Sequence, residues 1–259
     1  MNYQKKFIII VIAICLCTLG SALHQKLIAT DNQKENTQPE LKQAVYPIAP
    51  HYRPQAFNFD SEEVTFSKSQ LDQHKKLYEG YVNKRNEIAK DLATVDRSNA
   101  AGITYSAFRS LKIAETFARN GSLLHELYFE NLGMGTQIGT HTKNLLLQYF
   151  ESVEKFKEDL MACASCSRGW VLTCYCLDED RSHNFVLDAH NETVPALAIP
   201  ILAVDIYEHA YMIDYGINRA QYLKDMWENI NWDVVEKRVI KWLHKLQDKD
   251  DKLESSATL

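Results

Sequence analysis

The chain has 259 residues, a hydrophobic fraction of 46%, a charged fraction of 24% and a formal net charge of −5 at pH 7. This composition is typical of one globular chain that is long enough to bury a core, and it excludes a disordered protein. The sequence carries no internal repeat, phosphate-binding loop or basic nucleic-acid-binding patch, so we expect no nucleic acid among its partners.

The N-terminus has the pattern of a secretory signal peptide. Lys5 and Lys6 precede an almost unbroken apolar run at residues 7–19, and small residues follow at 20–22. We therefore expect residues 1–22 to be a signal peptide cut after Ala22, and the protein to be exported, to the periplasm or the medium if it is bacterial. An uncleaved anchor is the alternative, but the run is short for a bilayer span, so we expect no stable membrane span after cleavage.

Residues 23–56 are mostly polar and predict a tether before the folded part. Two long helical patterns follow at residues 71–93 and 106–132, separated by the break at 99–102. Because the connection between them is short, they predict an antiparallel helical hairpin, a domain spanning residues 57–135.

The second domain, residues 136–247, mixes helical and strand patterns. Helical segments at 143–164 precede strand-like segments at 170–177, 184–187 and 198–205, and further helices span 220–247. The predicted fold class is therefore α+β: the N-terminal helical hairpin, then an α/β domain with a small, mainly antiparallel three-stranded sheet flanked by helices. Residues 248–259 predict a frayed C-terminal tail.

Three histidines and one aspartate are candidate metal ligands. Asp205 and His209 stand four residues apart, a spacing that can bring both side chains to one ion. His74 and His125 each lie on an apolar or aromatic helix face, where a hydrogen-bonded core histidine is the commoner explanation for either one taken singly. Taken together, three imidazoles and a carboxylate suit iron or manganese, and the absence of a thiolate argues against structural zinc.

The order His74, His125, then Asp205-x-x-x-His209 resembles the iron/manganese superoxide dismutase family. The resemblance covers roughly residues 57–246 and has further matches at Arg168-Gly169-Trp170, Tyr211, Asp214-Tyr215, Tyr222-Leu223 and residues 227–232. It implies that the four ligands hold one iron or manganese ion per subunit, with water or hydroxide as a fifth ligand. The implied activity is conversion of superoxide to dioxygen and hydrogen peroxide through the +3 and +2 states of the ion. Either metal accepts these ligands, so the choice between them stays open.

The resemblance also implies roles for residues around the ion. Tyr81 matches the tyrosine that hydrogen-bonds toward the bound solvent, and Trp170 matches the indole that lines the metal pocket. Glu208 matches the carboxylate that reaches across a homodimer interface to the partner subunit's His209. The sequence leaves open whether the assembly is a dimer or a higher oligomer.

Two positions depart from the family pattern in ways that leave a choice. The first ligand usually stands eight residues before the tyrosine, where this chain has Gln73, whereas His74 stands seven before Tyr81. We predict His74, because a seven-residue spacing fits a regular helix. The glutamine that tunes the bound solvent is absent at Gly121, and its downstream place falls at His190 or Asn191. We favour His190, since its ring can donate or accept a hydrogen bond.

The gateway beside the site is also altered. Leu77 stands where the family often has a histidine, and Met212 stands where that histidine's tyrosine partner is usual. Loss of both partners leaves no orphan polar group, which predicts a variant gateway and an active site. The alternative is a weak or inactive relative that binds metal structurally or serves as an interaction module.

The cysteines that remain after the expected cleavage are Cys163, Cys166, Cys174 and Cys176. Their spacing disfavours a zinc cluster, because Cys174 and Cys176 flank a single residue in a predicted strand. In an oxidising exported compartment, one or two disulfides are the expected outcome. Three complete pairings are compatible with four cysteines, and the sequence does not choose among them.

Overall fold

The computed structural model describes residues 46–59, 64–98, 100–101, 105–192 and 194–257, with side chains described as far as residue 244. The predicted signal peptide and residues 23–45 of the predicted tether lie outside these ranges.

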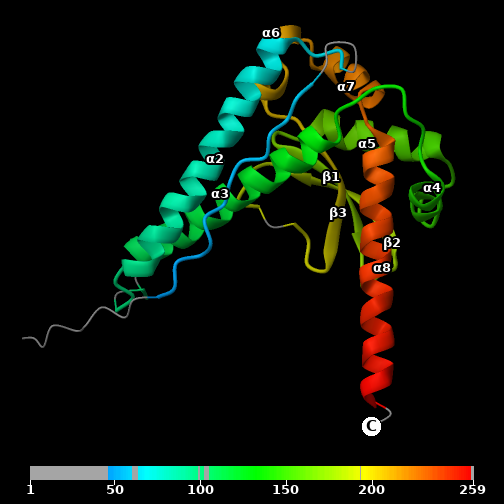
Figure 1. The fold of residues 1–259 in the computed structure, drawn as a ribbon. Helices are drawn as coiled ribbons and strands as arrows, with labels where there is room; N and C mark the ends of the chain where they lie inside the picture. Colours follow the sequence, from blue (N-terminus) through cyan, green and yellow to red (C-terminus); the bar gives the residue numbers. More distant parts are fainter. Residues whose placement is uncertain (1–45, 60–63, 99, 102–104, 193, 258–259) are drawn as a thin grey trace, which may run out of the picture. The chain divides into compact units, whose positions relative to one another are not determined.

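Two long helices form the antiparallel hairpin that the sequence predicted (Figure 1). Helix α2 spans Lys68–Thr94, and its N-cap Ser67 accepts a hydrogen bond from the Gln70 amide. Helix α3 spans Ala107–Glu130, and its N-cap Ser106 accepts from the Arg109 amide. Each cap satisfies an amide that has no partner within its helix. From Leu71 to Asn86 the buried positions of α2 recur every three or four residues, so one face of the helix packs against α3.

The second part of the chain begins with helices α4, Thr140–Leu147, and α5, Val153–Cys166. The sheet consists of β1, Trp170–Cys176, β2, Arg181–Leu187, and β3, Ala198–Asp205. Its order is β2-β1-β3, and both pairings are antiparallel. The chain continues through η1, Glu208–Ala210, α6, Met212–Tyr215, α7, Arg219–Glu228, and α8, Trp232–Ala257. This arrangement confirms the predicted fold class.

The register of the sheet brings candidate site residues together at one end of its strands. Trp170, the first residue of β1, pairs with Leu187 at the end of β2 and with Asp205 at the end of β3. The loop after β2 therefore starts beside Trp170 and Asp205. The central strand β1 is almost entirely buried, and its close packing makes this end of the sheet a rigid support.

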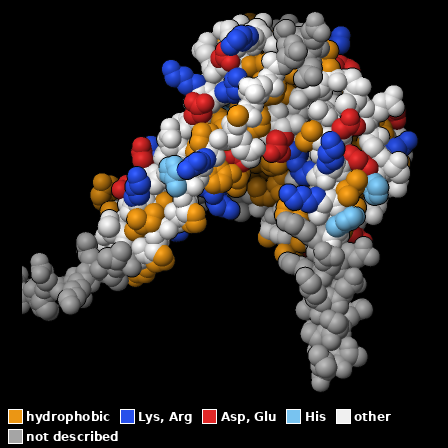
Figure 2. Space-filling view, viewed as in Figure 1, with side chains coloured by type: hydrophobic (Ala, Val, Ile, Leu, Met, Phe, Trp, Pro, Cys, Tyr) orange, Lys and Arg blue, Asp and Glu red, His pale blue; other side chains and the backbone are white. Residues whose placement is uncertain are grey.

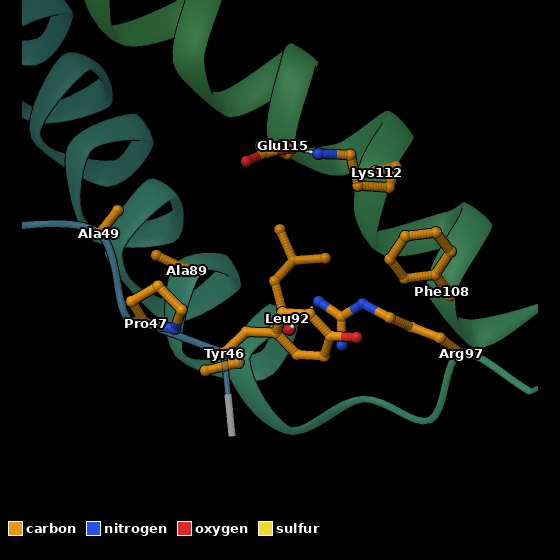
Figure 3. A pocket seen from close by; sticks show the side chains of 10 residues that line it. Tyr46, Pro47, Ala49, Ala89, Leu92, Arg97, Phe108, Lys112 and Glu115 are labelled. Atoms are coloured by element: carbon orange, nitrogen blue, oxygen red, sulfur yellow. Dashed lines mark hydrogen bonds and ion pairs between the residues drawn. The ribbon is translucent and has the colours of Figure 1, made fainter. Parts of the chain in front are cut away.

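Residues 46–59 lie in an extended conformation against the hairpin. The Tyr46 amide donates to the Ala93 carbonyl at 3.3 Å, and the Arg97 guanidinium lies 3.6 Å from the Tyr46 ring and 5.1 Å from the Phe108 ring. These side chains border a cavity of about 210 Å³ at the end of the hairpin (Figure 3). Farther along, the Tyr52 backbone exchanges two hydrogen bonds of 2.8 Å with the Asn86 side chain. The last part of the predicted tether is thus held to the hairpin.

The other end of the chain differs from the sequence expectation as well. Helix α8 continues to Ala257, through most of the tail that the sequence predicted to be frayed. Lys252, Leu253, Glu254 and Ala257 in this segment are residues that favour helix. None of the helices in the described ranges has the length and apolar character needed to cross a membrane.

The surface carries charges of both signs. On the face in Figure 2, Lys and Arg side chains are interspersed with Asp and Glu, while hydrophobic side chains gather in the hollow beside α3. This face therefore presents no large field of one sign.

Gly169 precedes β1 at a point where the backbone is closely packed. A Cβ atom there would lie 2.6 Å from the Leu187 carbonyl oxygen, and this contact cannot be relieved by a side-chain rotation. We expect Gly169→Ala to lower the free energy of unfolding by about 1–3 kcal/mol, measured by urea denaturation of the metal-free protein.

Gly80→Ala is the matched control, because a Cβ at this exposed position of α2 would meet nothing within 4 Å. It should raise the free energy of unfolding by about 0.5–1 kcal/mol, since glycine is unfavourable within a helix. Equal unfolding midpoints for the two variants would contradict the close packing at Gly169.

Candidate metal centre

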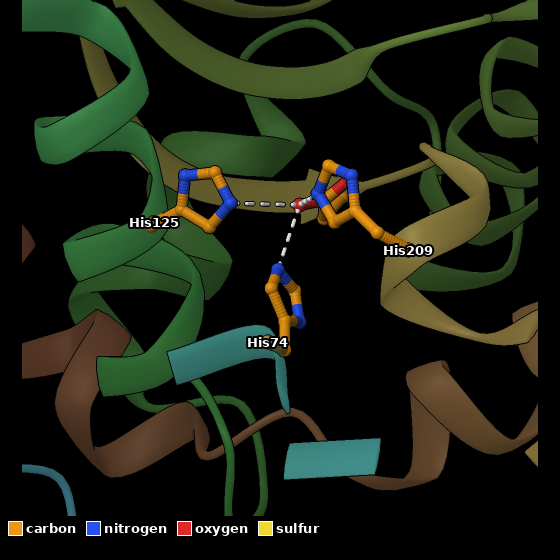
Figure 4. A group of neighbouring side chains, drawn as sticks. His74, His125 and His209 are labelled. Carbon is orange, nitrogen blue, oxygen red and sulfur yellow. Dashed lines mark hydrogen bonds and ion pairs between the residues drawn. The ribbon is translucent and has the colours of Figure 1, made fainter. Parts of the chain in front are cut away.

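Three imidazoles converge on one carboxylate oxygen. The Nε2 atoms of His74, His209 and His125 lie 3.1, 3.2 and 3.5 Å from Asp205 Oδ2 (Figure 4). The potential ligand atoms of the four residues all lie within 4.8 Å of one another. In the part of the chain that the structure describes, this is the only such group of histidine, cysteine, aspartate and glutamate side chains.

The four residues come from both parts of the fold. His74 lies on α2 and His125 on α3, whereas Asp205 ends β3 and His209 lies in the short helix η1. The second oxygen of Asp205, Oδ1, accepts a hydrogen bond of 2.9 Å from the Tyr207 amide. Tyr222 donates to the Asp205 backbone carbonyl at 2.6 Å. These contacts fix the carboxylate so that Oδ2 faces the histidines.

Burial sets the protonation states of the site. Asp205, His74 and His125 are fully buried, and His209 is partly exposed. Burial lowers the pKa of His74 and, more strongly, that of His125, so both imidazoles are neutral. Burial alone would raise the pKa of Asp205, but His209 and His74 outweigh it and hold this pKa far below its usual range. Neutral imidazoles and an ionised carboxylate are the forms that bind a metal ion.

The geometry fits one first-row ion. His125 Nδ1 donates to the Gly121 carbonyl, so Nε2 presents its lone pair toward Asp205 Oδ2. Within the described residues, this buried Nε2 has no hydrogen-bond partner. Two acceptors that face each other without a proton or cation between them are unfavourable. Ligands about 2.1 Å from an ion are separated by roughly 3.0–3.6 Å at angles of 90–120°. The separations of 3.1, 3.2 and 3.5 Å between Asp205 Oδ2 and the three Nε2 atoms fall in this range.

The helical register decides between the two candidates for the first ligand. His74 is buried and faces Asp205, whereas Gln73 is exposed and donates to Ser69 Oγ at 3.4 Å. The seven-residue spacing to Tyr81 therefore places the histidine, and not the glutamine, in the site.

A histidine from the loop after β2 lies beside the four ligands. His190 is buried, and its ring centroid lies 5.7 Å from that of His125. Trp170 Nε1 donates to His190 Nδ1 at 2.8 Å, and His190 Nε2 lies 3.0 Å from the Tyr81 hydroxyl oxygen. Asn191 is exposed, so only one of the two candidates from the sequence approaches the centre.

The bond from Trp170 fixes the tautomer of His190. Burial lowers the pKa of His190 to about 4, so the ring is neutral at pH 7 and carries one N–H. Because Nδ1 accepts from Trp170, the hydrogen is on Nε2 and is donated to Tyr81. The Tyr81 hydroxyl is then free to donate its own proton elsewhere. Both ring nitrogens contact protein groups here, and the hydrogen bond to metal-bound solvent that the sequence predicted for His190 stays a prediction.

Gly121 is required by the ring of Tyr81. A Cβ at this position would lie 2.7 Å from Tyr81 Cδ1. A side chain on α3 at residue 121 would thus displace the tyrosine. Because the Tyr81 ring occupies this space, α3 carries no side chain at residue 121 that could reach the metal centre.

The structure also locates the remaining candidates. Glu208 is exposed on η1, next to His209, and its predicted contact across a dimer stays a prediction. Leu77 is partly buried on α2, and Met212 is exposed on α6. Both positions of the altered gateway thus carry apolar side chains, without a polar group left unpaired.

The four cysteines are free thiols in the structure, where the sequence predicted one or two disulfides. Cys174 and Cys176 are buried in β1, and Cys163 and Cys166 lie one turn apart in α5. Residues two apart on a strand are separated by about 6.8 Å with parallel side chains, which is unfavourable for the Cβ separation of about 3.8 Å in a disulfide.

Sequence reasoning missed Glu126, which directly follows the ligand His125. This glutamate is almost fully buried and accepts hydrogen bonds from the hydroxyls of Tyr52 and Tyr78. The available signal was a charged residue within the otherwise apolar and aromatic run at residues 123–129.

Comparisons with known proteins agree with this site. The family model "Iron/manganese superoxide dismutases, C-terminal domain" matches residues 138–238. The chain is 37% identical over 202 residues to Superoxide dismutase [Fe] of Aquifex aeolicus, covering 75% of this chain and 92% of that protein. It is 30% identical over 197 residues to Superoxide dismutase [Fe] of Pyrobaculum aerophilum, covering 74% and 91%. It is 29% identical over 185 residues to Superoxide dismutase [Mn] 1 of Haloferax volcanii, covering 70% and 90%.

The fold and the buried site of three histidines and one aspartate define a mononuclear metalloprotein. The chain belongs to the iron/manganese superoxide dismutase family. This finding confirms the resemblance read from the sequence, together with the prediction of a single iron or manganese centre.

We expect His74→Ala to lower metal affinity by at least about 100-fold. Loss of a residue that only hydrogen-bonds to a metal ligand already lowers metal affinity by about 10–100-fold. Gln73→Ala should bind metal as the unchanged protein does, because its side chain points away from the site. Metal content per subunit after dialysis against a chelator measures the difference. Metal loss in Gln73→Ala with retention in His74→Ala would reverse the assignment.

Proposed function

We propose that this protein is an exported superoxide dismutase that converts superoxide to dioxygen and hydrogen peroxide. The observation that carries the proposal is the buried three-histidine, one-aspartate site with the His190 and Tyr81 pair beside it, in a chain of this family. When bound, an iron or manganese ion supplies the electron transfer by alternating between its +3 and +2 states.

The residues of the chain bind the ion, exclude water and handle protons. Asp205 supplies the one anionic ligand, and burial of Asp205, His74 and His125 keeps competing donors away. Formation of hydrogen peroxide from superoxide consumes two protons for each peroxide. Burial, followed by the charges of Tyr207 and Asp205, raises the pKa of Tyr81 to about 12, so its hydroxyl keeps a proton that it can donate.

His190 supports this role through Tyr81. Its Nε2–H donates to the tyrosine oxygen, while Trp170 holds the other side of the ring. Asn120 Nδ2 donates to the His190 carbonyl at 2.7 Å, which holds the loop in place. In this proposal, His190 orients the hydroxyl that delivers the proton.

The altered gateway favours a second candidate function, a metal-binding relative without useful activity. Leu77 and Met212 replace a polar pair of the family, so a hydrogen-bonded link at the entrance is lost. The ligands and Tyr81 are retained, however, and both gateway side chains are apolar. These observations support the enzyme over the inactive relative.

Two further parts of the proposal concern location and assembly. Lys5, Lys6, the apolar run and Ala22 support export and cleavage. A homodimer is supported by the exposed Glu208 beside His209 and by apolar side chains that follow it, with exposed fractions of 39% for Met212, 47% for Ile213 and 94% for Ile217. Apolar side chains in such a cluster are typical of an interface.

One experiment tests these parts on a single sample. The full chain is expressed in a Gram-negative bacterium, and the periplasmic fraction is purified. Intact mass should start after Ala22, metal analysis should give one ion per subunit, and sedimentation at micromolar concentration should give a dimer. Superoxide removal should exceed that of the same concentration of free metal. A metal-replete sample that removes superoxide no faster than free metal would favour the inactive relative.

His190→Ala should keep the metal but lower turnover by about 10- to 100-fold, because it releases Tyr81 and leaves the indole N–H of Trp170 without its acceptor. Metal content and steady-state superoxide removal are measured together. Asn191→Ala is the matched control and should be unchanged, since that side chain is exposed. Loss of turnover in Asn191→Ala alone would transfer the role to the neighbouring residue.

A further inference from the structure

A buried carboxylate lies directly beside the metal centre without a metal or cation partner. Glu126 has an exposed fraction of 5% and follows His125 on α3. Its Oε1 accepts from the Tyr78 hydroxyl at 2.7 Å, and its Oε2 accepts from the Tyr52 hydroxyl at 2.6 Å and from Gln55 Nε2 at 3.2 Å. No ion pair among the described residues includes Glu126. The groups that donate to this carboxyl are therefore two tyrosine hydroxyls and one amide, all uncharged donors.

These donors come from two other segments of the chain. Tyr78 lies one helical turn after the ligand His74 on α2, whereas Tyr52 and Gln55 belong to the extended segment 46–59. The Gln55 amide also donates to the Tyr78 hydroxyl oxygen at 2.8 Å. Glu126 thus joins α2, α3 and the extended segment at the level of two metal ligands.

Aromatic packing continues the same connection behind His74. The rings of Phe57 and Phe59 are stacked with centroids 6.4 Å apart, and they lie 5.1 and 5.9 Å from the Phe129 ring. Phe129 in turn lies with its centroid 4.8 Å from that of His74. The extended segment therefore supports the His74 imidazole through the Phe129 ring by packing, in addition to its hydrogen bonds.

We propose that segment 46–59 is a clamp that acts through Glu126 to hold His74 and His125 at ligating distance. The two histidines lie on separate helices, so the spacing between these helices sets the distance between two ligands. Hydrogen bonds from Tyr52 and Tyr78 to one carboxylate fix that spacing from outside the centre. Glu126 and Tyr52 are positioning residues in this account, because neither belongs to the group of ligands.

The inference predicts that metal retention depends on a hydroxyl that does not touch the metal. Tyr52→Phe should accelerate metal release to an excess of chelator by about tenfold, since a hydrogen bond to the buried Glu126 carboxyl is lost. It should also shift the ligand-field absorption of the loaded protein, which a purely structural contribution to stability would leave unchanged. Both are measured at 25 °C, well below unfolding.

Tyr46→Phe is the matched control. It makes the same change in the same segment, but the Tyr46 hydroxyl has no hydrogen bond among the described residues, and its ring packs on Arg97 (Figure 3). Metal release and absorption should both remain as in the unchanged protein. If both variants released metal equally faster than the unchanged protein, the segment would contribute only to general stability. That result would overturn the proposed clamp.

A double variant tests whether Tyr52 acts through Glu126. Glu126→Leu removes the acceptor, so adding Tyr52→Phe to it should change the release rate no further. Independent, additive effects would overturn the connection between the two residues. Because release and absorption are measured without superoxide, the outcome is separate from that of the proposed enzymatic activity.

Discussion

The structure depends on placing three imidazoles around one buried carboxylate. Asp205 Oδ2 lies within 3.1–3.5 Å of three Nε2 atoms, and the His125 nitrogen has no hydrogen-bond partner among the described residues. Such an arrangement is costly without a cation, because a charge and several polar atoms leave water together. A bound metal ion compensates for this cost, so the same geometry that destabilises the metal-free protein stabilises the loaded one.

The fold meets this constraint by joining a helical hairpin to the edge of a sheet. The hairpin supplies His74 and His125, while the ends of β1 and β3 bring Trp170 and Asp205 together. Close packing leaves little freedom at either part, since a Cβ at Gly121 would strike the Tyr81 ring and one at Gly169 would strike the backbone. Rigid supports on both sides keep the ligand distances fixed.

Two hydrogen-bonded groups surround the ligands and have different tasks. The chain Trp170, His190 and Tyr81 orients a hydroxyl that retains its proton, because its pKa is about 12. The network around Glu126 holds the two ligand helices at their spacing in our proposal. One group would therefore control proton delivery, and the other would control metal retention, so variants in the two should affect different measurements.

The sequence by itself determined the helical hairpin, the three strands, the order of the four ligands and the choice of His74, because these follow from the local periods of helices and strands. Only the tertiary structure showed that His190 is buried against Tyr81 while Asn191 is exposed, since the contact joins residues that are 109 positions apart. The tertiary structure also revealed that Glu126 accepts hydrogen bonds from Tyr52 and Tyr78. It showed that residues 46–59, part of which the sequence predicted to be a polar tether, are attached to the helical hairpin. Such contacts depend on how separate elements pack against one another. The spacing of residues along the chain carries no information about the distance between elements that are far apart in sequence.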